Sequence, residues 1–399
     1  MSEPAKRKKL AIITTVWTYL SHAQHMGDRF LVGYPHNGGW HRPEMDVVSL
    51  YVDQKPDGDQ SGDRAREFGL KVYPTIAEAL RCGSDRLAVD GVLVIGEHGD
   101  YPVNAKSQIQ YPRYEFFEQI VEVFQKDSGS VPVFNDKHLS YSHEKARAMV
   151  AASKRLGFAM LAGSSLPVTW RLPSVELPLE CAIEDALMVG CGGSDAMDFH
   201  ALEAMQCMLE RRRNGETGVK AVQLITGPAV WQAGTDGRWS RRLLEAALAR
   251  STSRSGKSMV DGRTQDLTHS GELEELVIEP AAYFIEYADG LRSTLLMLNG
   301  AVSDYTFACR LRGGGEIVST QFLLPVTPNV VYSACLMNKV EEMIATGVAP
   351  YPVERTELTS GILDFCLESK IRGNRRLDTP GLNIRYRPPS ASQFGDAQV

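Results

Sequence analysis

Several histidines follow short apolar runs in the first part of the chain. His22 and His25 come after the run 10–15, and their spacing of three places both on one face of a helix. Glu97 and His98 follow the apolar run 91–95. Neutral imidazole and carboxylate are the ligands that Zn²⁺, Mn²⁺ and Fe²⁺ prefer, but they also hydrogen-bond sugar hydroxyls. Both interpretations stay open, and the candidate metal ligands are His22, His25, His41, Glu97 and His98.

A second set of residues suits acid/base chemistry. Lys137 follows the apolar run 131–134, where partial desolvation depresses the pKa of an ammonium group. His200 lies two residues beyond Asp198 at the start of the predicted helix 198–213, so both side chains can point into one cleft. These three residues are the candidate catalytic group, with Asp195 as an alternative carboxylate.

The helices and strands that would position these residues are predicted to form two domains. Residues 1–165 alternate short aliphatic runs with amphipathic helices, which is typical of a Rossmann-like, doubly wound parallel sheet. The expected strands are 10–15, 47–52, 71–73, 91–95, 131–134 and 160–162, and the expected helices are 65–68, 75–81, 113–125 and 142–156. Thr75 and Glu78 have the spacing of a capping box. In such sheets the ligand lies beyond the carboxyl ends of the strands.

The pattern of expected helices and strands changes after residue 165. A helix over 198–213 precedes extended segments that dominate 218–326, and Asp289-Gly290 supplies the turn of a hairpin. Gly313-Gly314-Gly315 predicts another turn, helices return at 330–346 and 353–369, and 386–399 reads as a tail. We therefore expect 166–385 to form a substrate and oligomerisation domain with a mostly antiparallel open sheet and helices on one face. Pairing of such sheets between subunits would give a homodimer or homotetramer.

Composition excludes several classes of protein. The chain has 399 residues, and 43 Lys plus Arg against 49 Asp plus Glu give a formal charge of −6, which argues against a nucleic-acid partner. No apolar run approaches the ~20 residues that cross a bilayer. The seven scattered cysteines contain no Cys-x-x-Cys spacing and fit a reduced cytoplasm, so we expect a cytoplasmic protein with a small-molecule substrate.

Three segments resemble one family. They are Val131-Pro-Val-Phe-Asn-Asp-Lys-His138, Gly192-Gly-Ser-Asp-Ala-Met-Asp-Phe-His200, and the closing helices around 339–346 and 361–370. In order and spacing they are similar to the glucose–fructose oxidoreductase and inositol 2-dehydrogenase superfamily of sugar and polyol dehydrogenases. The resemblance implies NAD(P) as cofactor, and it implies that Lys137, Asp195 or Asp198, and His200 approach the carbon that loses hydride.

The first strand departs from the family. A dinucleotide site needs a Gly-x-Gly-x-x-Gly turn after that strand, because side chains keep the backbone away from the pyrophosphate. Here no glycine occurs between Thr14 and His25. Hydroxyls would have to replace the glycine contacts, and an acidic residue after the second strand would hold a ribose. The candidate cofactor-binding residues are Thr14, Thr15, Trp17, Asp53 and Glu97.

Two hypotheses about function follow. The first is an oxidoreductase-like enzyme that acts on a sugar, polyol or related hydroxylated molecule. The second keeps the fold but makes the protein a metal-dependent, non-redox lyase, isomerase or hydrolase that uses the His/Glu-rich strand ends. The candidate substrate-binding residues are His98, His138, Arg171, Trp170 and Trp40.

Overall fold

The computed structural model describes residues 7–257, 263–313, 317–325 and 327–395. The chain divides into two compact units. Unit 1 consists of residues 1–103, 109–163 and 325–353, and unit 2 consists of residues 104–108, 164–324 and 354–399. The segment 325–353, which we expected in the second domain, belongs instead to unit 1.

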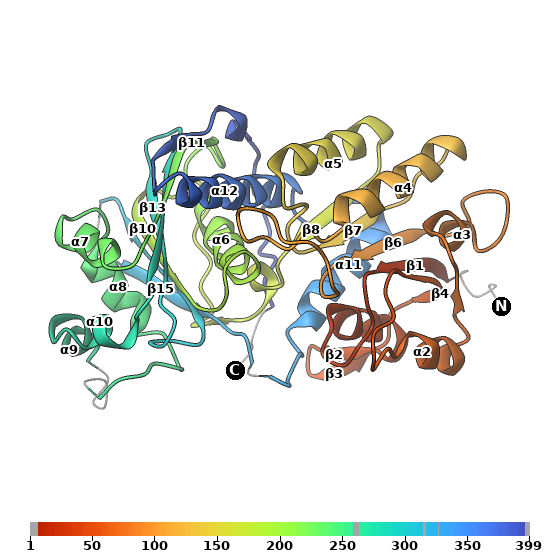
Figure 1. The fold of residues 1–399 in the computed structure, drawn as a ribbon, viewed down its shortest axis with the longest axis horizontal. Coiled ribbons are helices and arrows are strands. Elements are labelled where there is room, and N and C mark those ends of the chain that lie inside the picture. The colour runs from red at the N-terminus through yellow and green to blue at the C-terminus, as the bar shows by residue number, and fades with distance from the viewer. Residues whose placement is uncertain (1–6, 258–262, 314–316, 326, 396–399) are drawn as a thin grey trace. The chain divides into compact units, whose positions relative to one another are not determined.

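Unit 1 is built on a six-stranded parallel sheet of order β5-β4-β1-β6-β7-β8 (Figure 1). Its strands are β1 (Lys8–Thr14), β4 (Met45–Val52), β5 (Lys71–Val72), β6 (Gly91–Ile95), β7 (Val133–Asp136) and β8 (Met160–Gly163). The six predicted strands are therefore confirmed. Thr14 pairs in register with Val52 on one side and Ile95 on the other, so the loops after β1, β4 and β6 leave from one edge. We call this edge the strand-end crest: residues 15–22, 53–60, 96–101 and 136–138.

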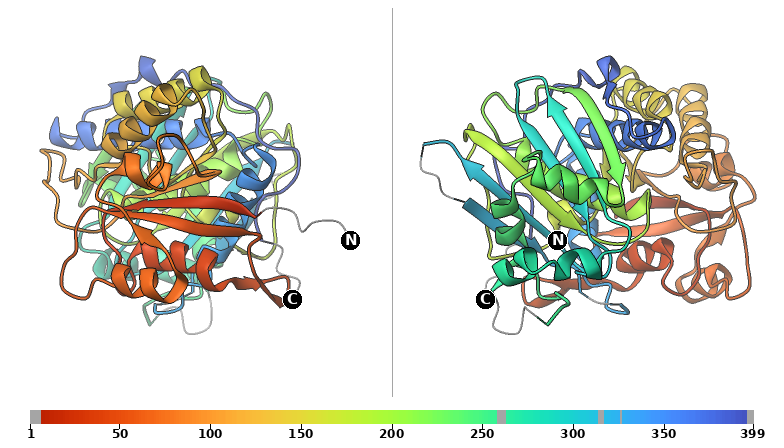
Figure 2. Two further views of the ribbon diagram at one scale, coloured as in Figure 1. Left: turned by 90° about the vertical axis from the view of Figure 1, so that its right-hand side faces the viewer. Right: turned by 60° about the vertical axis from the view of Figure 1, so that its left-hand side comes forward.

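Helices cover both faces of the parallel sheet. Alternate strand residues such as Val92 and Val94 pack against α3 (Ile76–Arg81), α4 (Arg113–Lys126) and α5 (His143–Leu156). On the opposite face, Gly91 lies against Ile344 of α11 (Ser333–Thr346), where a Cβ atom would be 3.1 Å from the Ile344 side chain. The remaining elements are the π-helix η1 (Ala23–Gly27), α1 (Asp28–Val32), α2 (Ser61–Phe68) and the hairpin of β2 (Tyr34–His36) and β3 (Gly39–His41). Figure 2 shows the red and orange strands of unit 1 side by side.

Local sequence signals explain several of these boundaries. The Thr75 hydroxyl accepts the backbone N–H of Glu78 at 3.1 Å, as a capping residue does, and α3 begins at the next residue. The helices α2 and α5 end at Gly69 and Gly157, whose φ angles are +70° and +71°. The predicted helices 75–81, 113–125 and 142–156 are confirmed within two residues.

Unit 2 is built on an eight-stranded sheet of order β16-β11-β12-β13-β10-β14-β15-β9. Its strands are β9 (Arg171–Leu172), β10 (Ile183–Gly190), β11 (Val219–Thr226), β12 (Ala281–Tyr287), β13 (Arg292–Met297), β14 (Tyr305–Leu311), β15 (Ile317–Phe322) and β16 (Leu377–Asp378). Among the described strands of this sheet, β10 and β13 alone pair in parallel, so the mostly antiparallel sheet is confirmed. The predicted hairpin forms between β12 and β13, with Gly290 at φ +90°.

The expectation of helices on one face is wrong, because helices cover both faces of this sheet (Figure 1). α6 (Ala196–Leu209) and α12 (Glu354–Ile371) pack on one face. α7 (Ala229–Thr235), α8 (Arg241–Leu248), α9 (Thr264–His269) and α10 (Glu272–Leu276) cover the other, within a stretch that we predicted to be extended. The missed signal was Ser240, whose hydroxyl accepts the Leu243 N–H and caps the strongly amphipathic α8.

Two further predictions concern termini and turns. The tail is tied down as far as it is described, because Gly395 N–H bonds the Val168 carbonyl at 2.8 Å and Tyr386 is buried. In the predicted glycine turn, Gly313 has φ +92°, whereas Gly314 and Gly315 lie outside the described residues. No helix in the described part of the chain is long and apolar enough to span a membrane.

Candidate functional site

A histidine–aspartate pair lies on the strand-end crest of unit 1. His22 Nδ1 is 2.6 Å from Asp136 Oδ2, and Asp136 is the last residue of β7. The His22 side chain is 14% exposed and that of Asp136 only 1%, so the imidazole shields the carboxylate. A carboxylate on Nδ1 fixes the imidazole tautomer and leaves Nε2 available for proton exchange. Asp136 was not among the predicted site residues, although its place at a strand end was a signal.

Two more imidazoles flank this pair. The rings of His22 and His25 stack at 5.6 Å, and His98 approaches His22 edge-on at 5.2 Å. Burial and the neighbouring His22 lower the pKa of His25 to about 3 and that of His98 to about 4, so both stay neutral near pH 7. His25 also meets the ring of Tyr332, from the segment just before α11. The sequence prediction that His22 and His25 share a helix face is confirmed.

A buried ionic cluster lies beneath the crest. Arg113, fully buried at the start of α4, forms an ion pair with Glu97 and donates to His138 Nε2 at 3.2 Å. Burial alone would raise the pKa of Glu97, but the charges of Lys137 and Arg113 outweigh it and hold that pKa far below its usual range. Burial and the Arg113 charge lower the pKa of His138, which stays a neutral acceptor. Arg113 gave no signal in the sequence, because nothing distinguishes it from a surface arginine.

Lys137 follows β7 directly and has a left-handed backbone, with φ +66°. Its N–H bonds the Gly163 carbonyl at 3.1 Å, which continues the pairing of β7 with β8 by one residue. The residue is only 3% exposed. Lys137 thus belongs to the buried charged layer next to Glu97, and this burial agrees with the predicted desolvation. A non-glycine residue at positive φ costs free energy, and such conformations concentrate at functional sites.

The expected cofactor residues of the first turn are occupied within unit 1. The Thr14 hydroxyl donates to the Ile95 carbonyl at 2.9 Å, and the Thr15 hydroxyl donates to the Glu97 carbonyl at 2.8 Å. Trp17 is fully buried, and its ring lies so close to Gly27 that a Cβ there would be 2.5 Å from Trp17 Cη2. Trp17 is therefore a core residue and forms no wall for a sugar or nucleotide.

Asp53 follows β4, as the sequence predicted, but both of its carboxylate oxygens already accept hydrogen bonds. The Tyr51 hydroxyl donates to Oδ1 at 2.8 Å, and the Tyr101 hydroxyl donates to Oδ2 at 2.7 Å. Because each carboxylate oxygen has two acceptor positions, Asp53 keeps some capacity for a ligand.

Unit 2 carries the other candidate catalytic residues near the start of α6. Asp195 caps this helix at φ +71° and accepts a hydrogen bond from Gln108 Nε2 at 3.0 Å. Asp198 accepts the Asp195 N–H at 3.2 Å and the Tyr283 hydroxyl, and it is 3% exposed. Burial raises the pKa of Asp198 although the Tyr283 hydroxyl opposes the shift. The two aspartates thus form the predicted acidic start of α6, held by groups that sequence spacing did not reveal.

His200, also on α6, is hydrogen-bonded through Nδ1 to the Ser164 hydroxyl. Ser164 follows β8, and its backbone N–H points to Glu203 Oε2 at 3.4 Å. Thr359 of α12 donates to the other Glu203 oxygen at 2.6 Å. His200 is therefore positioned by a serine rather than by Asp198, which we had expected to accompany it.

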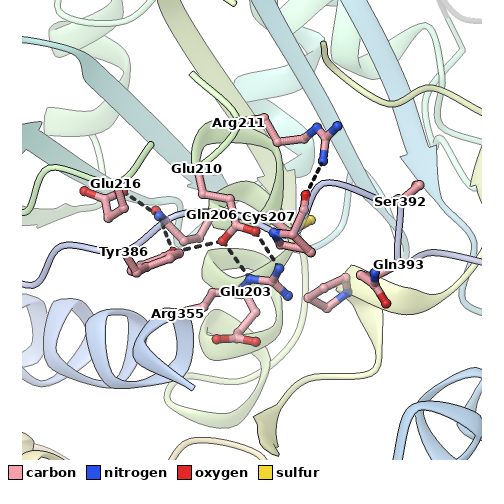
Figure 3. Close-up of polar contacts among 12 residues, drawn as sticks. Glu203, Gln206, Cys207, Glu210, Arg211, Glu216, Arg355, Tyr386, Ser392 and Gln393 are labelled. Atoms are coloured by element: carbon pink, nitrogen blue, oxygen red, sulfur yellow. Dashed lines mark hydrogen bonds and ion pairs between the residues drawn. The ribbon is translucent and has the colours of Figure 1, made fainter. Parts of the chain in front are cut away.

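A larger buried polar network continues along α6 (Figure 3). Arg355 binds both oxygens of Glu210, at 2.8 and 2.5 Å, and the Tyr386 hydroxyl donates to the same carboxylate at 2.9 Å. Gln206 donates to Glu216 at 2.6 Å. These contacts satisfy buried charges and tie the C-terminal segment to α6, so we assign them a structural role.

The expected metal site does not assemble. His41 lies on β3, where Nε2 is 2.8 Å from Glu341 of α11. Glu341 also accepts the N–H of Glu44, just before β4 begins, so His41 belongs to the amino end of that strand and not to its carboxyl end. Within the described residues, no three His, Cys, Asp or Glu side chains are arranged to hold a metal ion.

The expected substrate-binding residues outside the crest are placed elsewhere. Trp40 is 60% exposed on β3 and donates to the Val32 carbonyl. Arg171 is buried in unit 2, where it pairs with Glu176 at 2.8 Å and stacks on Phe394 at 4.2 Å. This arginine is engaged within unit 2 and is not a free clamp for an anion. Trp170 is half-buried beside it.

Comparisons with known proteins identify the fold. No protein-family model matches the chain, and no curated protein matches it in sequence. Solved structures do match over almost the whole chain. GenD2 from gentamicin A biosynthesis, solved in complex with NAD, is 14% identical, with 94% of this chain and 97% of that one covered and a TM-score of 0.56.

Two inositol dehydrogenases give similar values. The myo-inositol 2-dehydrogenase from Lactobacillus plantarum is 10% identical, with 94% and 99% of the chains covered and a TM-score of 0.53. The myo-inositol dehydrogenase from Lactobacillus casei, solved with NAD(H) and myo-inositol, is 11% identical, with 94% and 97% covered and a TM-score of 0.55. The chain has the fold of these dehydrogenases, and the family resemblance predicted from the sequence is confirmed at the level of the fold.

Proposed function

We propose that this protein is an enzyme that acts on a sugar, a polyol or a related hydroxylated small molecule, as the oxidoreductases of this fold do. The observation that carries the proposal is the grouping of proton-transfer residues at the end of β7. Lys137 and Asp136 are consecutive, Asp136 holds His22, and Lys137 is buried in a layer with Glu97. A buried ammonium, an imidazole and a carboxylate at the carboxyl end of a parallel strand can exchange protons with a bound hydroxyl group.

In this proposal Lys137 is the acid/base group closest to the reacting carbon. Its backbone is fixed by the bond to Gly163, so the side chain leaves the strand in one direction. In unit 2, Asp195, Asp198 and His200 stay the predicted catalytic residues. The Ser164 hydroxyl at Nδ1 fixes the orientation of the His200 ring.

NAD(P) supplies the hydride acceptor when it is bound to enzymes of this class. In this chain Thr14, Thr15, Trp17, Asp53 and Glu97 would have to hold it. They do not fit that task well, because the hydroxyls and the indole are used internally and Glu97 is buried in an ion pair. We therefore derive no step through the nucleotide.

A second candidate function is an acid/base reaction without net oxidation, such as a dehydration or isomerisation of the same substrate class. The His22–Asp136 pair favours it, because an imidazole oriented by a carboxylate can take a proton from a substrate and return it without an electron acceptor.

One experiment tests the proposal and separates the two reactions. The purified protein is incubated with a panel of sugars, polyols and their keto and acid derivatives, with and without NAD⁺ or NADP⁺, and products are followed by NMR. Turnover that is lost in Lys137→Met supports the proposal, and its dependence on nucleotide identifies the reaction class. No conversion of any compound, or full activity of Lys137→Met, would contradict it.

A further inference from the structure

The loops of the strand-end crest are bound to one another in the region where this fold places a dinucleotide. Asp53 N–H donates to the Thr14 carbonyl at 3.0 Å, Gln54 N–H to the Thr15 carbonyl at 2.8 Å, and Gln60 N–H to the Trp17 carbonyl at 2.7 Å. The loop after β4 thus continues the pairing of β4 with β1 beyond the last residue of each strand.

The loop after β6 joins the same arrangement through side chains. Gln54 makes two bonds to Asp100: Nε2 donates to its carbonyl, and Oε1 accepts its N–H, both at 2.9 Å. The Tyr101 hydroxyl reaches Asp53 at 2.7 Å. The order of the sheet reverses at β1, which has β4 on one side and β6 on the other, so these bonds span the topological switch point where such sheets bind ligands.

Three backbone donors of the turn after β1 are also used. Phosphate binding in this fold depends on free N–H groups at the start of the first helix. Here Thr18 N–H bonds the Ser21 hydroxyl at 3.0 Å, Leu20 N–H bonds Gln24 Oε1 at 2.5 Å, and Ser21 N–H bonds the Thr18 carbonyl at 3.0 Å.

The helix after this turn also differs from the first helix of a dinucleotide site, whose N-terminus binds phosphate. It begins as a π-helix at Ala23, and Trp17 fills the space beneath it against Gly27. In a Gly-x-Gly-x-x-Gly turn, the absence of side chains creates room for the pyrophosphate. In this chain the turn is packed with an indole, and His22, paired with Asp136, stands at the start of the helix.

We propose that this chain does not bind a dinucleotide at the position usual for its fold. In this proposal the strand-end crest is a proton-transfer site centred on His22 and Asp136 that works without a nucleotide. The inference rests on the proposed function for its substrate class, but it makes a separate claim. The chemistry at the crest is then proton transfer without an electron acceptor, as in the isomerisation of a hydroxycarbonyl compound. The C–H bond beside the carbonyl breaks, its proton goes to His22 Nε2, and its electron pair forms the C=C bond of an enediol while the carbonyl oxygen takes up a proton. His22 then returns its proton to the former carbonyl carbon while the other enediol hydroxyl loses its proton and becomes the new carbonyl, so no electrons leave the substrate.

The test has two binding measurements. Nucleotide released from the heat-denatured protein is quantified by chromatography, and the protein is titrated with NADH and NADPH by fluorescence. We expect no stoichiometric nucleotide and no saturable binding up to millimolar concentrations. Nucleotide recovered in stoichiometric amount, or micromolar binding that NAD⁺ or NADP⁺ displaces, would overturn the inference.

A pair of variants probes the loop contacts. The Gln54→Ala/Tyr101→Phe variant removes the bonds that tie the loop after β6, whereas Tyr51→Phe removes a hydroxyl from the same Asp53 carboxylate without touching that loop. Hydrogen exchange should quicken over 97–101 in the first variant and stay unchanged in the second. Equal exchange in the wild type and in the Gln54→Ala/Tyr101→Phe variant would show that these bonds do not close the crest, and would count against the inference.

Failure of the proposed function is distinguishable from failure of the inference. Absence of turnover on every hydroxylated compound contradicts the function and leaves the nucleotide measurements valid. Turnover that requires added NAD⁺ or NADP⁺ supports the function and contradicts the inference. Turnover without nucleotide that is lost in His22→Gln but retained in His36→Gln, a matched change in the β2–β3 hairpin, supports both.

Discussion

Truncation of the Trp17 side chain should destabilise unit 1 strongly, because the indole fills part of the core under the turn after β1. The ring is fully buried, and removing a buried Trp side chain costs about 3–5 kcal/mol. Gly27→Ala should also destabilise, by about 1–3 kcal/mol, because its Cβ would lie 2.5 Å from Trp17 Cη2 in a helix that otherwise tolerates alanine.

The two changes should be coupled. In the Trp17→Ala/Gly27→Ala variant the ring that the new methyl group would strike is gone, so the loss should fall short of the sum by roughly the cost of Gly27→Ala alone. The free energy of unfolding is measured by urea denaturation followed by far-UV circular dichroism, with Trp40→Ala as the exposed control. A Trp17→Ala loss below about 1 kcal/mol, or strict additivity, would refute the packed first turn.

Three further predictions follow from the buried titratable groups. Lys137→Met should lower kcat by about 10²–10⁴ in the NMR turnover assay, with the fold checked by circular dichroism, and wild-type turnover would remove Lys137 from the mechanism. His25, whose pKa is about 3 when folded against an ordinary 6.5, binds its proton only in the unfolded chain across that interval; its contribution to stability is present above pH 6.5 and lost as the pH falls toward 3. The urea midpoint of His25→Asn should therefore fall less steeply between pH 6.5 and 4 than that of the wild type, and parallel slopes would disprove it. Arg355→Met should cost about 3–5 kcal/mol by leaving the buried Glu210 without its counter-charge, and Arg355→Met/Glu210→Leu should recover much of that in the same denaturation assay.

The parallel sheet could be predicted because each strand is a short aliphatic run, and because a strand buried on both faces shows no alternation of polar residues. The position of Lys137 directly after β7 could be predicted as well, since a polar residue after such a strand lies at the edge of the sheet where ligands bind. The partner of His22 could not, because 114 positions separate it from Asp136 and only the sheet order brings them together. His41 illustrates the converse error: proximity in sequence to His22 suggested one cluster, but a hairpin carries it to the amino end of β4.

The second sheet was harder because covering helices are short. α8 has eight residues and α10 only five, so neither shows enough turns to separate helical from extended periodicity. These covering helices also bear on the expected pairing of sheets between subunits. We expected an open sheet face that pairs between subunits, but Leu243, Leu248 and Leu267 already pack against strand residues such as Leu187 and Leu296 on that face. Pairing two copies through these strands would require the helices to leave, which would expose the same apolar area that pairing is meant to bury. A homo-oligomer of this chain, which stays a prediction, must therefore use a surface other than this face of the sheet.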